Sequence, residues 1–275
     1  MATSAMPVIK HSLKTHRFVI PYRVYGQGLH SLVFINGVQQ SMAMWHSFVR
    51  RFSRDYRIVI FDSPNQGKGR VVHGSLHISL EEQVGVVEAV IDAAGIDGQL
   101  TICSASWGGV IAASYAVKHP KRVQRLIMAS MGTRPSEKMV EMITKGAQMA
   151  PDDRDEVAET MIRNFGQDLP PAMKNKIVTQ FRQMSREALQ AFCQHGLWVL
   201  SVRELSNAVD VSKIQCKTIL LHGEKDTIID VHDVTFLASQ IPHSEMKVIK
   251  NVGHFLHLER EDLLDVYEEI LAAPC

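Results

Sequence analysis

Short apolar runs rich in β-branched residues alternate with amphipathic stretches over most of the chain. Runs that end in turn residues predict buried strands, and apolar positions at intervals of three and four predict helices. The predicted strands are residues 32–35, 57–61, 100–103, 123–129, 218–221 and 246–249. The predicted helices are residues 82–94, 110–118, 231–240 and 261–271. This alternation is typical of an α/β fold with a mostly parallel central sheet that is flanked by helices on both faces.

The alternation stops between residues 135 and 212. Here the sequence becomes a series of helical patterns, interrupted by helix-breaking residues. The interruptions fall at Pro151, Gly166, Pro170 and Pro171. We therefore expect one core domain made of residues 1–134 and 213–275, with residues 135–212 inserted into it as a helical cap.

The composition excludes several classes of function. The chain has 30 Lys and Arg against 29 Asp and Glu, and its net charge of +1 gives no field that would hold a polyanion. A nucleic-acid partner is therefore not expected. No segment approaches the roughly 18 uncharged apolar residues of a membrane span, and residues 1–14 lack the apolar region of a secretory signal. The oligomeric state is left open by the sequence.

The cysteines and histidines indicate a cytoplasmic protein with no metal site. A chain of 275 residues does not need disulfides, and its four cysteines form no CxxC pair, so free thiols in a reducing compartment are expected. These cysteines are Cys103, Cys193, Cys216 and Cys275. No His or Cys pair has ligand spacing apart from His254 and His257, so no metal is expected. Because Gly67-Lys68-Gly69 is too short for a nucleotide-binding signature, no cofactor is expected either.

A serine stands at the turn from the predicted strand 100–103 into the next helix. The stretch Ser104-Ala105-Ser106-Trp107-Gly108 fits the nucleophile elbow, in which small residues lie two positions before and after the reactive serine. The spacing has a steric cause, because the chain reverses so sharply that bulky side chains there would collide. The short motif alone is equally typical of an ordinary turn. Its strand-turn-helix context makes Ser106 the candidate nucleophile.

The predicted strand 218–221 runs into a loop that contains Asp226, at the edge where open α/β sheets build their sites. A triad acid accepts a hydrogen bond from one histidine nitrogen, so that the other nitrogen is free to take the serine proton. Asp226 suits this role, and the loop after the preceding strand, residues 130–133, contains no carboxylate. Rival carboxylates, each also typical of a solvated loop, are Glu224, Asp230 and Asp233.

The candidate base is one of 13 histidines. His254 follows the last predicted strand, and a Gly-His pair there puts an imidazole on a loop that can reach back to the serine. His257 is the rival, three residues later. His222 lies before the acid loop and His243 before its strand, so both are poorly placed.

An acyl-transfer site also needs fixed N–H donors for the negative charge that develops on the substrate oxygen. One expected donor is the backbone N–H of Trp107, directly after the nucleophile. The other is the backbone N–H of Val38, because the Asn36-Gly37 turn after the first predicted strand presents it to the same place.

With these residues assembled, the chain resembles the α/β-hydrolase superfamily from about residue 19 to residue 271. Within it, residues 104–109 (SASWGG) and 253–259 (GHFLHLE) resemble a bacterial group that contains 3-(3-hydroxyalkanoyloxy)alkanoate synthase and 3-hydroxyacyl-carrier-protein transacylase or thioesterase. The resemblance implies that Ser106, Asp226 and His254 form a triad. It further implies a medium-chain 3-hydroxyacyl thioester as substrate, with an acyl carrier protein or CoA as its carrier. Residues 227–229 depart from the group's pattern, which leaves the acyl chain and the acceptor open.

The predicted cap contains six of the 13 methionines. They suit either an adaptable acyl pocket or the ordinary core of amphipathic helices. The six are Met139, Met142, Met149, Met161, Met173 and Met184. The basic residues Lys174, Lys176, Arg182 and Arg186 are a candidate contact for an acidic carrier protein, although such a small cluster is usually a solvated face.

Three functions therefore remain open from the sequence. The first is acyl transfer from a thioester to a hydroxyl or thiol, and the second is hydrolysis of an ester or thioester by the same triad. The third is a non-enzymatic small-molecule binder on this fold, because a fold does not determine a function.

Overall fold

The computed structural model describes residues 8–148 and 153–274. Its core is a nine-stranded sheet in the order β1-β2-β4-β3-β6-β7-β8-β9, with β5 paired to β2. The strands are β1 (Val8–Lys14), β2 (Phe18–Tyr25), β3 (His30–Ile35), β4 (Tyr56–Phe61), β5 (Arg70–Val71), β6 (Leu100–Ala105), β7 (Val123–Ala129), β8 (Lys217–Gly223) and β9 (Ser244–Ile249). All pairings from β4 to β9 are parallel, so the predicted mostly parallel sheet is confirmed.

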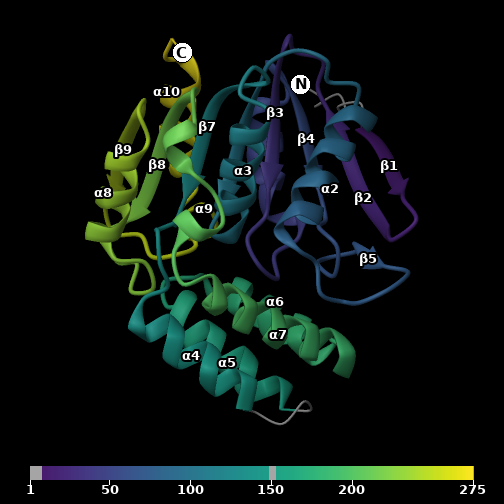
Figure 1. Cartoon of the computed structure of the whole chain (residues 1–275), viewed down its shortest axis with the longest axis vertical. Helices are drawn as coiled ribbons and strands as arrows, with labels where there is room; N and C mark the ends of the chain where they lie inside the picture. The colour runs from purple at the N-terminus through teal and green to yellow at the C-terminus, as the bar shows by residue number, and fades with distance from the viewer. Residues whose placement is uncertain (1–7, 149–152, 275) are drawn as a thin grey trace.

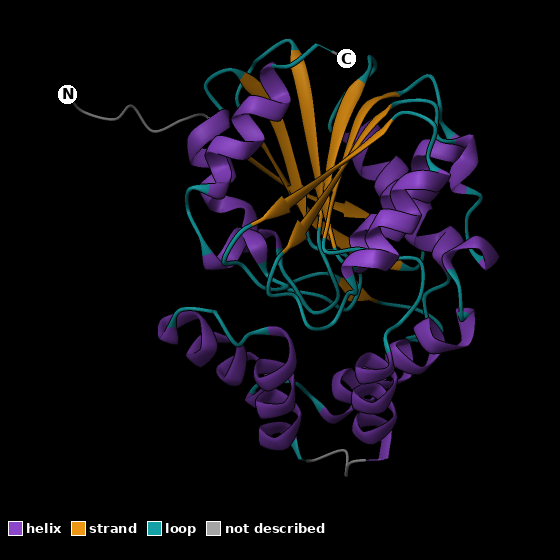
Figure 2. Ribbon diagram, turned by 90° about the vertical axis from the view of Figure 1, so that its left-hand side faces the viewer, coloured by secondary structure: helices purple, strands orange, loops and turns teal. Residues whose placement is uncertain are grey.

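Helices cover both faces of this sheet (Figure 1, Figure 2). One face carries α2 (Leu80–Ala93), α3 (Trp107–Lys118) and α8 (Val231–Gln240), and the other carries α1 (His46–Phe52) and α10 (Leu263–Ala272). Successive side chains of a strand point to opposite faces of the sheet, so one strand contributes to the core on each face. In β3, Val33 and Ile35 pack in the first core cluster, whereas Leu32 and Phe34 pack in the second.

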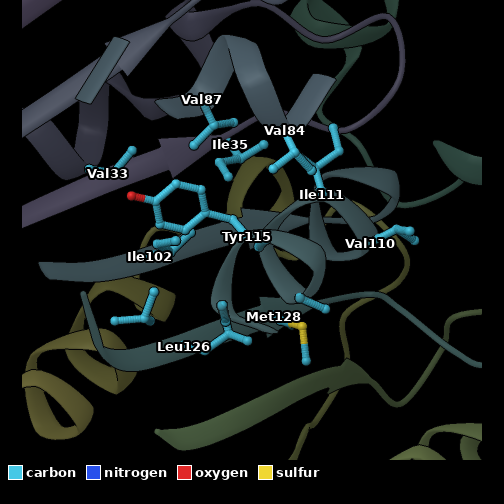
Figure 3. Packing of buried hydrophobic residues seen from close by; sticks show 14 of the residues in the cluster. Val33, Ile35, Val84, Val87, Ile102, Val110, Ile111, Tyr115, Leu126 and Met128 are labelled. Carbon is cyan, nitrogen blue, oxygen red and sulfur yellow. The ribbon is translucent and has the colours of Figure 1, made fainter. Parts of the chain in front are cut away.

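Tyr115 of α3 lies inside the first cluster, among side chains from α2, β3 and β6 (Figure 3). Only 2% of its surface is exposed. Nine of the twelve residues of α3 are buried, so packing fixes this helix against the sheet over its whole length. The N-terminus of α3 is fixed with it, directly after the candidate nucleophile.

Four helices between β7 and β8 form a separate layer opposite the carboxyl ends of the parallel strands (Figure 1). They are α4 (Glu137–Gln148), α5 (Arg154–Phe165), α6 (Pro171–Arg182) and α7 (Arg186–Val202). We call these four helices the helical layer. They pack as two pairs, α4 with α7 and α5 with α6, which spread apart in Figure 2. The connection over residues 149–152, with Met149, lies outside the described residues.

The sequence pattern missed the first two strands and several short elements. β1 and β2 pair antiparallel with each other, and β2 carries Pro21, a residue that argues against an interior strand. α1 and α9 (Leu256–Glu259) were missed because seven and four residues are too few to show a helical period. Over the described residues, no helix is long and apolar enough to cross a membrane.

Candidate active site

Ser106 stands on a strained turn between β6 and α3. Its φ of 50° and ψ of −125° fall in a region that side chains other than glycine rarely adopt. The surrounding backbone holds this conformation, since Ser106 N donates to Ala129 O at 2.8 Å and Ser106 O accepts from Gly109 N at 2.7 Å. The strain turns the hydroxyl toward the space beyond the sheet edge, where open α/β sheets place their sites.

The residues two positions to either side of Ser106 explain how so sharp a turn fits. A Cβ at Gly108 would lie 2.6 Å from the Asn36 carbonyl oxygen and 2.7 Å from that of Ile35, so only glycine lets α3 pass β3. Ser104 is fully buried and donates its hydroxyl hydrogen bond to Ile127 O at 3.2 Å. A serine is therefore satisfied at the position where glycine is commonest.

Asp226 lies in the loop after β8 with its side chain completely buried. Oδ1 accepts from the backbone N–H groups of Ile228 and Ile229, at 2.9 and 3.1 Å. Oδ2 lies 2.8 Å from His254 Nδ1. Burial raises the pKa of Asp226, but the charge and hydrogen bond of His254 and the two backbone bonds outweigh it and leave the pKa below its ordinary value. The carboxylate is therefore ionised at neutral pH.

An ionised carboxylate only accepts hydrogen bonds, so the proton between the two residues sits on Nδ1 of His254 and leaves Nε2 able to accept another. The loop that carries His254 is held from two sides. Glu259 accepts from Gly253 N at 2.6 Å and from Phe255 N at 3.0 Å. Ser130 donates its hydroxyl hydrogen bond to His254 O at 2.6 Å. Neither bracing residue was predicted.

Each rival carboxylate makes contacts away from His254. Glu224 accepts from Asn251 N at 2.9 Å, and Asp230 caps α8 by accepting from His232 N at 2.7 Å. Asp233 accepts from Thr133 N at 2.6 Å and so anchors the loop after β7. These side chains tie loops together, whereas Asp226 is the carboxylate hydrogen-bonded to His254.

The rival histidines also lie elsewhere. His257 is buried and stacks on Trp45, with ring centroids 4.8 Å apart, and neither ring nitrogen has a hydrogen-bond partner among the described residues. Burial lowers its pKa to about 3, so the ring is neutral. His222 is buried beside the acid loop, and His243 is exposed before β9. Of these histidines, His254 is the one that lies against both Asp226 and the space in front of Ser106.

Ser106, His254, Val38 and Trp107 line one cavity between the sheet and the helical layer. Its empty volume is about 1100 Å³, including the part open to solvent. Most of its wall is apolar, and α4, α5 and α7 of the helical layer contribute part of it. Residues of that wall include Met139, Met142, Ile143, Met161, Phe165 and Val199. We call it the acyl cavity.

The two predicted oxyanion donors lie on either side of Ser106. Trp107 is the first residue of α3, where a backbone N–H has no partner within the helix. Val38 lies in a turn that is closed by Gly37 N donating to the Gln40 side chain at 2.8 Å. Gln39 in that turn has a φ of 58°. The turn brings Val38 to the wall of the acyl cavity.

The methionines divide between the two interpretations. Met139, Met142 and Met161 line the acyl cavity, whereas Met184 packs within the helical layer and Met173 lines a separate groove. Met161 also contacts the core of the layer. Some methionines of the helical layer therefore line a cavity, and others fill the core of the layer.

Aromatic rings form the inner wall of the acyl cavity. Trp107 donates its indole N–H to Gln83 Oε1 at 2.9 Å, which ties the ring to α2. The same ring meets His195 and Trp198 of α7 edge to face, with centroids 5.4 and 5.1 Å away. Burial lowers the pKa of His195 to about 4. The side chain next to the nucleophile thus connects the core to the helical layer by neutral ring contacts.

In the part of the chain that the structure describes, no group of three or more His, Cys, Asp or Glu side chains is arranged to hold a metal ion. Cys103 and Cys193 are not disulfide-bonded, and Cys275 lies outside the described residues.

A family model described as alpha/beta hydrolase fold matches residues 30–261. Among curated proteins, the chain is 25% identical to the (R)-3-hydroxydecanoyl-ACP:CoA transacylase of Pseudomonas putida, over 87% of this chain and 83% of the relative. It is 26% identical to the pimeloyl-[acyl-carrier protein] methyl ester esterase of Nitrosospira multiformis, over 84% of this chain and 90% of the relative.

Solved structures share the same architecture. A crystal structure of a putative lipase from Acinetobacter baumannii matches with a TM-score of 0.81 and 20% identity, over 96% of this chain and 91% of the other. Sequence identity at this level shows a common fold and does not identify the substrate.

Proposed function

The chain belongs to the α/β-hydrolase fold family, and from that premise we propose that it is a serine-dependent acyl-transfer enzyme with Ser106, His254 and Asp226 as its triad. One observation carries the proposal. His254 Nδ1 lies 2.8 Å from the buried Asp226 carboxylate, and the other face of the ring borders the same cavity as the strained Ser106 turn. A base held in one tautomer, bordering the same cavity as a half-buried serine, is the arrangement that nucleophilic acyl transfer needs.

The proposed reaction runs in two halves. Ser106 Oγ attacks the carbonyl carbon of an ester or thioester while His254 takes the hydroxyl proton, and the N–H groups of Val38 and Trp107 hold the charged oxygen. Collapse of that intermediate breaks the bond to the leaving group, which receives the proton from His254. An acceptor hydroxyl, thiol or water then loses its proton to His254, attacks the acyl-serine and releases the product with Ser106 restored.

We propose that the acyl group is a 3-hydroxyacyl chain of roughly ten carbons, delivered as a thioester of an acyl carrier protein or CoA. The relatives in Pseudomonas bear that chemistry in their names. The apolar acyl cavity supports it, since each buried methylene adds about 0.8 kcal/mol to binding. Residues 135–212 would then act as a cap that shields the acyl-serine from water.

Hydrolysis is the second candidate, because the relatives include a carrier-protein methyl ester esterase. Transfer and hydrolysis share the acyl-serine and differ in which acceptor reaches it first. The acyl cavity is open to solvent on one side, so the relative rates depend on how completely the bound acyl chain fills it.

The test supplies the purified chain with 3-hydroxydecanoyl-CoA and with 3-hydroxydecanoyl acyl carrier protein, and identifies the products by mass spectrometry. A 3-hydroxyacyl ester dimer, or acyl exchange between the two carriers, supports transfer. Free 3-hydroxydecanoate alone would make the protein a thioesterase. Rapid cleavage of p-nitrophenyl acetate with no reaction of either thioester would make it a small-ester carboxylesterase.

A fluorophosphonate probe separates an enzyme from a binder on the same fold. The proposal expects covalent labelling at Ser106, identified by peptide mapping, and no labelling of Ser106→Ala. If the folded wild-type chain stays unlabelled and turns over none of these substrates, the non-enzymatic binder becomes the better interpretation.

A further inference from the structure

A second cavity lies beside the first. The acyl cavity is lined by α4, α5 and α7, whereas this groove is lined mainly by α6, by residues 38–50 and by the segment after His254. Val38, Gln40, Met161 and Phe255 line both spaces, so the groove meets the acyl cavity at the predicted oxyanion turn. We call it the side groove.

The side groove differs from the acyl cavity in its charge. His46, Arg50 and Lys176 line it, and Arg23 lies behind His46, with Arg23 Nη1 3.4 Å from His46 Nε2. Over the described residues, neither Arg23, Arg50 nor Lys176 forms an ion pair with a carboxylate. Arg50 and Lys176 thus line the groove on its α1 and α6 sides, Arg23 lies beside His46, and none of the three is in an ion pair among the described residues.

Two carboxylates near the groove accept backbone hydrogen bonds. Asp62 is buried and accepts from Met42 N at 2.7 Å and from Lys68 N at 2.9 Å. Glu259, which lines the groove, accepts two backbone bonds from the loop that carries His254. Arg260 also lines the groove and is paired with Asp262, and Glu261 beside it is exposed.

The lowered pKa of His46 agrees with several basic groups lying near it. Burial lowers its pKa, and the charges of Arg23, Arg50 and Lys176 lower it further, while Asp62 acts in the opposite direction. A bound anion would relieve this repulsion. Guanidinium and ammonium groups are the side chains that most often hold phosphate oxygens in proteins.

We propose that Arg50, Lys176 and His46 bind a phosphate group on the carrier arm of the acyl donor, whose thioester end reaches Ser106 past Val38 and Gln40. This inference rests on the proposed function. The acyl chain would lie against α4, α5 and α7 and its carrier arm against α6, so different helices of the layer would bind the two halves of the donor. Gln180 Nε2 of α6 donates to Gln39 O at 3.0 Å, which holds the wall of the groove against the oxyanion turn.

The phosphate has two sources with shared chemistry. CoA carries phosphates on both its pantetheine arm and its nucleotide, whereas an acyl carrier protein presents one phosphodiester on the same arm. Removal of the cationic charge should weaken both if the arm phosphate is bound, and CoA alone if the nucleotide phosphates are bound.

The kinetic test uses the double variant Arg50→Gln/Lys176→Gln, which removes both charges and keeps polar side chains of similar length. Lys145→Gln is the matched control, because Lys145 is also an exposed cation of the helical layer, pairs with Glu141 and does not line the groove. Circular dichroism and thermal melting confirm that all variants fold. The substrates are the 3-hydroxydecanoyl thioesters of CoA, of acyl carrier protein and of N-acetylcysteamine, which has no phosphate.

The double variant should raise KM for a phosphate-bearing thioester by about tenfold or more with kcat little changed, and leave the N-acetylcysteamine thioester unaffected. Lys145→Gln should behave as wild type with all three. Equal losses with and without phosphate, or no loss with either, would overturn the site.

A direct binding measurement tests the phosphate site independently of catalysis. Calorimetric titration with CoA and with phosphate-free pantetheine needs no turnover. Wild type should bind CoA at least tenfold more tightly than pantetheine, and the double variant should lose that difference. A chain that binds CoA in this way but turns over no thioester would retain the site and refute the proposed function. Equal affinity of wild type for CoA and pantetheine would refute the site, whatever the activity.

Discussion

The central sheet and the helical layer are packed to very different degrees. Every residue of β6 is buried, and α3 buries nine of its twelve, whereas α4 buries none and α7 buries only Leu189 of seventeen. The predicted triad and oxyanion residues belong to the core, whereas α4, α5 and α7 of the layer contribute part of the acyl cavity wall. The proposed reacting atoms thus lie on a densely packed framework, while the part of the wall from the layer has little packing of its own.

The cause lies in how each region buries its apolar side chains. Parallel strands between two helical faces exclude water on both sides, so their residues stack into large clusters. The helical layer has its own cluster of only four buried residues, and several of its other apolar side chains line the cavities. Regions with few buried contacts open more easily than the fold as a whole. We therefore expect core substitutions to act on chemistry and global stability, and layer substitutions to act on selectivity.

The largest expected effect is on the reacting atoms. Ser106→Ala should lower kcat by at least about 10³-fold, because the hydroxyl forms the covalent bond and no other group replaces it. Its melting temperature should stay close to that of wild type, since the side chain is small. His254→Ala should be comparably inactive, and His257→Ala only mildly affected. Activity near the wild-type level in folded Ser106→Ala would reject the nucleophile, and an essential His257 with a dispensable His254 would reject the base.

Asp226→Asn should cost less than loss of the nucleophile but still roughly 10²- to 10⁴-fold in kcat. The backbone donors at Ile228 and Ile229 would hold the amide oxygen at the Oδ1 position, so the NH2 group would face His254 Nδ1 and the productive tautomer would be lost, while Ser106 and the proposed oxyanion donors remain. Asp233→Asn is the matched control on a carboxylate that anchors a loop. Comparable kinetic losses in the two variants, measured with the same thioester, would remove Asp226 from its proposed role.

Replacing one buried phenylalanine in the central sheet and one in the helical layer tests the packing difference most directly. Phe34 of β3 and Phe181 of α6 are both almost fully buried, at 0% and 3% exposure. Phe34→Ala should lower the global free energy of unfolding by about 3 to 5 kcal/mol. Phe181→Ala should lower it by less, about 1 to 2 kcal/mol, because the layer's own cluster is small. Urea unfolding measures the first quantity, and hydrogen exchange in α5, α6 and α7 should accelerate only in Phe181→Ala.

Buried neutral histidines make stability depend on pH. His257 stays unprotonated in the fold down to a pKa of about 3, whereas in the unfolded chain it takes a proton near pH 6.5. Stability is therefore full above pH 6.5 and falls as pH decreases toward the folded pKa, by roughly 2 to 3 kcal/mol between pH 6.5 and 4.5. His257→Phe, which keeps a ring against Trp45, should flatten that dependence in urea unfolding at the two pH values. An unchanged slope would mean that His257 is not held neutral.

Most of the framework of the fold could be predicted because it depends on local patterns. Strand 123–129 and helix 231–240 have the predicted bounds, and the parallel strands were recognised as apolar runs. Loops that follow parallel strands meet at one edge, which is why chain order brought Ser106, Asp226 and His254 together. The strand that contains Pro21 was missed, because proline removes the donor that an interior strand normally uses.

The contacts that surround the site could not be predicted. Glu259 and Ser130 hold the His254 loop through hydrogen bonds to its backbone. Every residue type has these backbone groups, so the sequence does not show which of them accept or donate such a bond. The methionines of the helical layer show the same limit. Helical period identifies an inward face, but whether Met142 and Met184 face a cavity or another helix depends on how the two pairs spread.

The smallest expected effect concerns those two methionines. Met142 lines the acyl cavity and Met184 packs inside the layer, so Met→Ala at each position separates selectivity from stability. Met142→Ala should raise KM for a ten-carbon 3-hydroxyacyl thioester about three- to fivefold, since roughly one methylene's worth of contact is lost. The enlarged cavity should also shift the preferred chain length upward.

Met184→Ala should lower the stability of the helical layer without changing the order of preference among acyl chains of eight, ten and twelve carbons. Competition between these thioesters in one reaction, analysed by mass spectrometry, gives the ratios of kcat/KM directly. An unchanged ratio in Met142→Ala would place the acyl chain outside the cavity under α4 and α7. A shift in Met184→Ala of the same size would mean that the layer repacks as a unit, and that selectivity is not a property of the side chains that line the cavity.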